Sequence, residues 1–288
     1  MPQLRIGTCG WKYPSWAGLV YSTEKTNFLS EYCSRFTTVE VDQWFWSLFG
    51  SGASRLPHWA DAEHYRRCVP DDFRFTVKVP NSITLTHFRA KAKTDPLVPN
   101  PHFLSASLFN RFLDCLEPLH PVLGPLIFQF ESLNWKKMNG PEEFQRLFGE
   151  FVGQLPTGFG YALEIRNPDY LDDDFFLFMG ERRLVPVLLE GYWMPSVVQV
   201  YNKCRSALLK HPAVVVRLHG PDRDGTERQT GDSWGALIVR RDDEMAGIVG
   251  MVRELLEAGV DVYLNVNNHY EGCAPLTIER IERLLGPS

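Results

Sequence analysis

Short apolar segments recur along the chain and alternate with longer amphipathic ones. The most distinct is AVVVRLHG over residues 213–220, which becomes polar at its carboxyl end through Arg217 and His219. Such a run predicts a strand that is buried on both faces of a parallel sheet. Seven further segments are predicted as strands, namely residues 4–10, 37–46, 73–79, 125–130, 160–166, 184–190 and 261–267.

Helical patterns lie between most of these strands. They predict helices over residues 24–35, 54–68, 105–119, 141–152, 173–179, 243–257 and 277–285. The helix 243–257 carries an apolar stripe, and Gly259 suits the left-handed residue that ends many helices. Eight strands alternating with helices favour an α/β fold, a TIM (β/α)8 barrel, and we expect one domain over residues 1–288.

Two long connections are expected to be loops. Residues 81–103 show no clear periodicity of hydrophobic residues, which is typical of a loop. Because this segment carries Arg89, Lys91 and Lys93, we expect it to form a lid for an anionic ligand over the carboxyl ends of the strands. Residues 221–234 are rich in Gly, Asp, Arg and Thr and predict an exposed loop.

Composition narrows the class of protein. The formal net charge of −5 argues against a surface for non-specific DNA binding, so a nucleic-acid partner is a secondary hypothesis. The six cysteines are scattered and contain no CxxC pair, which favours reduced thiols in the cytoplasm over a zinc ribbon or a disulfide framework. No segment reaches 18 uninterrupted apolar residues and no signal peptide is evident, so we expect a soluble protein without a membrane partner.

The inward-facing side chains of a parallel barrel meet at the carboxyl ends of its strands, where active sites lie. Alternation along the strands predicts a polar inward set that comprises Thr8, Glu40, Asp42, Thr76, Lys78, Gln129, Glu164, Arg166, Glu190, Arg217, His219, Asn265 and Asn267, with His269 just beyond. Burial of these groups is costly unless they pair with one another or with a ligand. Fixed ion pairs between strands are the structural alternative to a pocket.

The balance of charge in this set leaves room for a cation. Four carboxylates face three cations, so a divalent metal or a protonated His219 would complete the balance. No cofactor is identified by a motif. A divalent ion, if one binds, is expected among Glu164, Glu190 and His219, with Asn267 or His269 nearby, and direct pairing of the carboxylates with arginines is the alternative.

Aromatic residues also gather in predicted loops at this end. Trp11, Trp16 and Trp193 follow predicted strands, and aromatic walls of this kind suit the stacking of sugars or bases. The alternative is that these side chains belong to the ordinary core.

Several motifs carry a resemblance to a known family. IGTCGWKYPSW, TVEVDQWFW, FRFTVKVP followed by ITLTH, LGPLIFQF, ALEIRNP, VVVRLHG and YLNVNNHYEGCAP resemble the successive strand motifs of the domain-of-unknown-function 72 family, also called the YecE-like family. The resemblance implies a TIM-barrel fold and no particular activity. It implies site-end residues at Trp11, Glu40, Lys78, His87, Gln129, Glu164, Arg166, Arg217, His219, Asn267, Asn268 and His269.

Two classes of function remain open. The first is a hydrolase or isomerase that acts on a sugar, a sugar phosphate or a nucleotide. In this hypothesis Glu164 or Glu40 is the general base and His219 is an acid or base, while the developing negative charge is stabilised by Lys78, Arg166 and Arg217. Ligand-binding roles are expected for Trp11, His87, Gln129, Asn267, Asn268 and His269. The alternative is a non-catalytic protein that binds an anionic ligand or a nucleic-acid end.

Overall fold

Eight parallel strands close a barrel in the order of the chain, from β1 to β8 and back to β1. The computed structural model describes residues 2–50, 52–89, 92, 95–231 and 233–286. The strands are β1 (Leu4–Thr8), β2 (Thr38–Val41), β3 (Arg74–Lys78), β4 (Leu123–Gln129), β5 (Tyr161–Glu164), β6 (Val185–Gly191), β7 (Ala213–Gly220) and β8 (Asp261–Val266). The predicted TIM (β/α)8 barrel is therefore confirmed.

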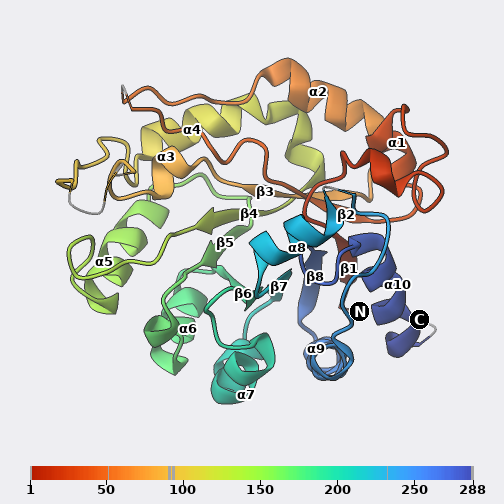
Figure 1. The fold of residues 1–288 in the computed structure, drawn as a ribbon. Helices are drawn as coiled ribbons and strands as arrows, with labels where there is room; N and C mark the ends of the chain where they lie inside the picture. Colours follow the sequence, from red (N-terminus) through yellow and green to blue (C-terminus); the bar gives the residue numbers. More distant parts are fainter. Residues whose placement is uncertain (1, 51, 90–91, 93–94, 232, 287–288) are drawn as a thin grey trace.

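Helices surround this barrel, as Figure 1 shows. They are α1 (Phe28–Tyr32), α2 (Trp59–Cys68), α3 (Asn81–Thr84), α4 (Ala106–Cys115), α5 (Pro141–Val152), α6 (Asp173–Glu181), α7 (Val197–Leu208), α8 (Arg223–Thr230), α9 (Asp242–Glu257) and α10 (Ala274–Leu285). Short 3-10 helices cover Pro14–Trp16, Glu117–Val122 and Pro168–Tyr170. None of the helices in the described ranges is long and apolar enough to cross a membrane.

Two apolar layers hold the barrel. The larger lies between the strands and the helices and is rich in aromatic contacts, among them Phe128 of β4 against Phe109 of α4. The smaller lies inside the barrel and consists of Ile127, Ala162, Val185, Val187 and Val215. This inner cluster fills the barrel below its carboxyl end, so that polar side chains further along the same strands are held above an apolar floor.

Three helices, α3, α7 and α8, were not anticipated from the sequence. α8 lies within residues 221–234, where an exposed loop was expected, because the Asp222 side chain accepts the N–H of Gly225 at 2.8 Å and Gly231 ends the helix at φ 55°. Its low apolar content concealed it, since only Gly225 and Thr226 are buried. α7 begins with a capping box between Ser196 and Gln199.

Several predicted boundaries were too wide. The strand predicted over residues 37–46 is limited to Thr38–Val41, because the chain turns after Val41 and Phe45 donates its N–H to the carbonyl of Asp42. Residues 81–103 are not entirely a loop, since they begin with α3. Of the expected lid cations, Lys91 and Lys93 lie outside the described residues.

Gly220 ends β7 in a conformation that only glycine adopts readily. Its φ is +76°, and an added Cβ would lie 2.6 Å from the carbonyl oxygen of His269 and 3.1 Å from the Cα of Tyr270. The close approach brings the end of β7 against the loop that follows β8. His219, one residue earlier, is thereby placed beside that loop.

Candidate functional site

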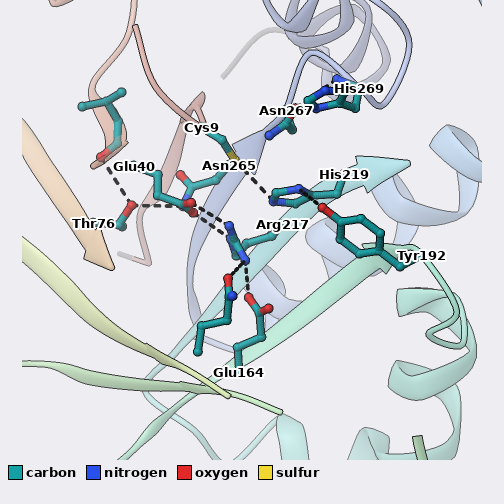
Figure 2. Close-up of polar contacts among 12 residues, drawn as sticks. Cys9, Glu40, Thr76, Glu164, Tyr192, Arg217, His219, Asn265, Asn267 and His269 are labelled. Atoms are coloured by element: carbon teal, nitrogen blue, oxygen red, sulfur yellow. Dashed lines mark hydrogen bonds and ion pairs between the residues drawn. The ribbon is translucent and has the colours of Figure 1, made fainter. Parts of the chain in front are cut away.

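The centre of the site is the guanidinium group of Arg217, which comes from β7 and is 1% exposed. Its Nε and Nη2 donate to the two carboxylate oxygens of Glu40 on β2, at 2.7 and 2.6 Å. Its Nη1 contacts the carboxylate of Glu164 on β5 and lies 3.3 Å from the Oε1 of Gln129 on β4. Figure 2 shows this one side chain joining acids from two strands inside the barrel.

A second arginine completes the pairing of Glu164. The Nε of Arg166 donates to the Oε1 of Glu164 at 2.8 Å, and its guanidinium carbon lies 5.0 Å from the ring centre of Tyr192. Burial alone would raise the pKa of Glu164, but the charges of Arg217 and Arg166 lower it to about 2. Glu164 is therefore a fixed anion near neutral pH.

Lys78 of β3 differs from the two arginines because its amine forms no ion pair with any residue in the described ranges. It lies 4.0 Å from the ring centre of Phe45. Burial and then the positive charge of Arg217 lower the pKa of Lys78 to about 8. The amine therefore stays mostly protonated at neutral pH, and its pKa is close enough to neutrality for proton transfer.

His219 lies between a thiol and a phenol. Its Nε2 is 3.8 Å from the Sγ of Cys9, which directly follows β1, and its Nδ1 is 3.3 Å from the hydroxyl of Tyr192 (Figure 2). Burial and the charges of Arg217 and Arg166 hold the pKa of His219 well below its usual range. The imidazole is therefore neutral, and burial likewise raises the pKa of the Cys9 thiol.

Cys9 was not predicted as an inward residue, because alternation along the strand was expected to place Thr8 inward. Thr8 pairs in register with Val39 and Val266, two members of the outer core, and its hydroxyl lies 2.8 Å from that of Tyr32 on α1. Because successive side chains of a strand point to opposite faces, the residue after Thr8 points inward. Tyr192 was also missed as a site residue, although it lies in an aromatic loop and adopts φ +57°.

Glu190 was predicted to point inward, and this prediction was wrong. Its carboxylate accepts the backbone N–H of Val197 at 2.8 Å, at the start of α7. Val185 and Val187 occupy the inward positions of β6, so Glu190 falls on the outer face. The expected metal set of Glu164, Glu190 and His219 is therefore not assembled.

Asn265 of β8 supports Glu40 from a further strand. Its Nδ2 donates to the Oγ1 of Thr76 at 3.1 Å and lies 3.4 Å from the Oε2 of Glu40. Asn265 is fully buried, and its Oδ1 has no hydrogen-bond partner among the residues that the structure describes. The site thus contains an unsatisfied acceptor next to its central carboxylate.

The loop after β8 divides into two parts. Asn267 accepts the backbone N–H of His269 at 3.0 Å, and the Nε2 of His269 lies 3.0 Å from the Oε1 of Glu227 on α8. Asn268, by contrast, accepts the N–H of Ala274 at 2.9 Å, at the start of α10. Asn268 therefore supports a helix terminus.

The expected aromatic walls are only partly present. Trp11 is 4% exposed and packs edge-to-face against Tyr65 of α2 at 5.1 Å, and Trp16 is fully buried. These two side chains belong to the core, and Trp11 is not among the residues that line the pocket described below. Trp193 is exposed, as are Trp46 and Trp135 in the loops that follow β2 and β4.

A pocket of about 560 Å³ opens above the charged network. It is formed by the loops that follow β2 to β5 and is lined by Phe45, Trp46, Leu48, Gly50, Asn81, Leu85, His87, Phe88, Arg89, Leu97, Gln129, Glu131, Lys137 and Arg166. The expected lid segment thus contributes His87 and Arg89 next to Gln129 and Arg166. Lys137, which the sequence analysis did not select, pairs with Glu131 at 2.6 Å.

A larger hollow of about 690 Å³ lies at the amino ends of the strands. Its lining is mostly apolar, with Leu4, Ile6 and Leu256 among its members, and its Arg35 is paired with Glu282 at 2.9 Å. Chemistry in parallel barrels takes place at the opposite end. The smaller pocket, which adjoins the charged network, is therefore the candidate site.

Comparisons with known proteins agree with this fold. The model of the family described as "Protein of unknown function DUF72" matches residues 5–288. The chain is 28% identical to the UPF0759 protein YecE of Escherichia coli O157:H7 over 216 residues, which cover 73% of this chain and 68% of that protein. With the same-named protein of strain K12 it is 28% identical over 165 residues, which cover 57% of this chain and 49% of that one.

Solved structures give the same result. The barrel is similar to a DUF72 family protein from Enterococcus faecalis V583, with a TM-score of 0.68, 19% identity and coverage of 99% of this chain and 96% of that one. It is also similar to a DUF72 family protein from Thermotoga maritima MSB8, with a TM-score of 0.68, 21% identity and coverage of 99% and 100%. At these identities the similarity shows the fold. The names of these proteins state no activity.

Proposed function

The chain belongs to the DUF72 family of unknown function, and we propose that it is an enzyme that binds a small anionic or sugar-like molecule at the carboxyl end of its barrel. The proposed reaction is a hydrolysis or an isomerisation by acid–base catalysis. One observation carries the proposal, namely a buried charge network directly below an open pocket that is lined with cations.

The pocket lining favours an anion. Arg89 and Arg166 bring positive charge to one side of the barrel mouth, where Lys137 is paired with Glu131 and where His87 and Gln129 add further polar groups. Arg166 uses its Nε for Glu164, and the planar guanidinium has further donors that suit a carboxylate or phosphate. The exposed Trp46 offers an apolar face beside them, which supports a sugar-like ligand.

The proposed acid–base roles follow from the different pKa values that the site gives to Glu164 and Lys78. Glu164, with a pKa of about 2, is a poor general base and acts as a fixed negative charge that orients Arg166 and Arg217. Lys78, with a pKa of about 8, is the group that we propose for proton transfer. Neutral His219, whose pKa is held well below its usual range, is a weak base and takes no part in proton transfer in this proposal.

A cytoplasmic location is part of the same proposal. All six cysteines are free, including the buried Cys9, Cys204 and Cys273, and free thiols persist in a reducing compartment.

Ligand binding and turnover are tested separately. Binding of inorganic phosphate, a sugar phosphate and a uronate would be measured by calorimetry at low and high ionic strength. We expect binding that weakens as salt increases and that Arg89→Gln weakens further, because exposed charges are screened. The matched control is Arg111→Gln, an exposed arginine on α4 that does not line the pocket.

Turnover of the ligands that bind would be followed by NMR. We expect Lys78→Met to abolish it. Binding without turnover by the unaltered chain would favour the alternative, a non-catalytic protein that binds an anionic ligand or a nucleic-acid end. Absence of binding by all three probes would contradict the proposal.

A further inference from the structure

Three potential metal ligands lie together beside the charge network. One ligand atom each from Cys9, Glu40 and His219 lies within 4.8 Å of the other two, and all three residues are buried. They come from the ends of β1, β2 and β7, so their positions are set by the barrel and not by a mobile loop. The expected metal set shared only His219 with this cluster.

We propose that Cys9, Glu40 and His219 form a binding site for a transition-metal ion of the zinc type. A thiolate, an imidazole and a carboxylate are the ligands that Zn²⁺ takes in proteins. Zn–S and Zn–N bonds of about 2.3 and 2.0–2.1 Å at a tetrahedral angle place sulfur and nitrogen about 3.6 Å apart. The Sγ of Cys9 and the Nε2 of His219 are separated by 3.8 Å, which is close to this spacing.

The surroundings of two ligands support the assignment. Metal-bound histidines use their second ring nitrogen for a hydrogen bond that fixes the tautomer, and the Nδ1 of His219 lies 3.3 Å from the Tyr192 hydroxyl. Arg217 holds both oxygens of Glu40. An ionised carboxylate has about four lone-pair sites, so Glu40 retains electron pairs for an ion.

Independent support comes from Asn265. This fully buried residue lies next to Glu40, and its Oδ1 is without a partner in the described part of the chain. A buried acceptor without a donor is costly and points to a missing group at the site. A water molecule or a hydroxyl of a ligand would be such a donor.

Metal binding at this cluster is accompanied by the release of a proton. The Cys9 thiol loses its proton to solvent as the S–metal bond forms, so one proton is released for each ion bound. The Cys9 thiolate is then the one added negative charge that faces the divalent ion, because Glu40 is already paired with Arg217. Three protein ligands leave a fourth position open, as in catalytic zinc sites.

The test uses the full chain after removal of metal with a chelator. Zn²⁺ is titrated by calorimetry in two buffers of different ionisation enthalpy, and Co²⁺ is added as a spectroscopic probe. We expect one ion per chain, release of one proton, a higher Tm and a thiolate-to-cobalt charge-transfer band. Because every readout concerns the metal itself, failure here is distinct from failure of the proposed enzymatic function.

Variants identify the ligands. Cys9→Ser is expected to abolish the cobalt band and to weaken Zn²⁺ binding more than about 100-fold, since loss of an outer contact alone costs 10–100-fold. Tyr192→Phe, which removes only an outer contact, is expected to weaken Zn²⁺ binding by about 10–100-fold. The matched control is Cys204→Ser, which removes a buried free thiol of α7 outside the cluster and leaves binding unchanged.

Two results would overturn the proposal. One is a metal-free chain that binds neither Zn²⁺ nor Co²⁺, which would leave Cys9 and His219 as a simple thiol–imidazole hydrogen bond. The other is unchanged Zn²⁺ affinity in both Cys9→Ser and His219→Gln. Circular dichroism and the Tm of each metal-free variant establish that it is folded, and His219→Gln serves as the ligand test if Cys9→Ser does not fold.

Discussion

Arg217 holds both carboxylate oxygens of Glu40, at 2.7 and 2.6 Å, although 177 positions separate the two residues in the chain. Both side chains are buried, so each charge depends on the other for its compensation. The same guanidinium also contacts Glu164 and Gln129. The pair therefore joins β2 and β7 across the interior of the barrel, and the behaviour of the site depends on it.

Removal of Glu40 should destabilise the protein strongly. Glu40→Ala leaves Arg217 with less compensation in a buried site, and the loss of one partner of a buried pair costs about 3–5 kcal/mol. Chemical denaturation would measure the change. Glu150→Ala removes an exposed acid that is paired with Arg146 at 3.0 Å on α5, and should change stability little. Equal effects of the two substitutions would refute the importance of the Glu40 pair.

Glu164 should contribute stability that is lost only in strong acid. Its pKa is lowered to about 2 in the folded chain, whereas an unfolded glutamate titrates near 4.3. The contribution is thus complete above about pH 4.3 and disappears as the pH falls through about 2. Unfolding free energies of the original chain and of Glu164→Gln, measured from pH 6 to 2, should converge toward the acid end. A constant difference would contradict the lowered pKa.

The contribution of Lys78 to stability should also rise with pH, but in the alkaline range. Its pKa is lowered to about 8 in the folded chain, while an unfolded lysine titrates near 10.4. Between these values the unfolded state binds more protons, so the contribution of Lys78 to stability rises with pH. Other groups titrate in this range, and the comparison with Lys78→Met isolates the effect. We expect Lys78→Met to have the larger free energy of unfolding at pH 8 and this excess over the original chain to shrink toward pH 10. An excess that does not change with pH would exclude the lowered pKa of Lys78.

Gly220 should tolerate alanine far less than Gly231 does. Gly231 has φ +55° and open space around an added Cβ, so Gly231→Ala should cost about 1–2 kcal/mol from the left-handed backbone alone. In Gly220→Ala the new Cβ would also meet the backbone of His269 at 2.6 Å. Thermal unfolding should show the larger loss of stability for Gly220→Ala. Similar losses for the two variants would mean that the loop after β8 moves to accommodate the new methyl group.

α8 should be held to the barrel mouth through His269. The Nε2 of His269 lies 3.0 Å from Glu227, and the Thr226 hydroxyl lies 3.5 Å from the carbonyl oxygen of His269. Glu227→Ala should therefore increase amide hydrogen exchange across Arg223–Thr230, because α8 buries few apolar groups. Glu63→Ala on α2, which removes an exposed pair with Arg67, is the control and should leave exchange in α8 unchanged.

The strands and much of the charged layer could be predicted from the local pattern of apolar and polar residues along the chain. β7 occupies residues 213–220 as predicted, because its apolar run is compatible only with burial on both faces. Alternation with a period of two then placed Glu40, Glu164 and Arg217 on inward faces, and the barrel brings them together. The family motifs were likewise readable along nearly the whole chain, and the match over residues 5–288 confirms them.

The errors arose where one position changes the face of a side chain. Thr8 was placed inward when the next residue, Cys9, occupies that place, and Glu190 was placed inward although it follows the inward Val187 by three positions. A shift of one residue reverses every orientation along a strand, and the register between β6 and β7 itself shifts after Glu190. Neighbouring strands, and not the local pattern, determine which face is inward.

The partners of the charged groups depend on distances that no local pattern contains. Nothing along the chain distinguishes an arginine that neutralises Glu164 from a metal that does so, because the residues concerned lie on different strands. Closure of the barrel determines that two guanidinium groups reach Glu164 and that Cys9 reaches His219. Electrostatic interactions fall off with distance and strengthen with burial, and both quantities are properties of the folded chain.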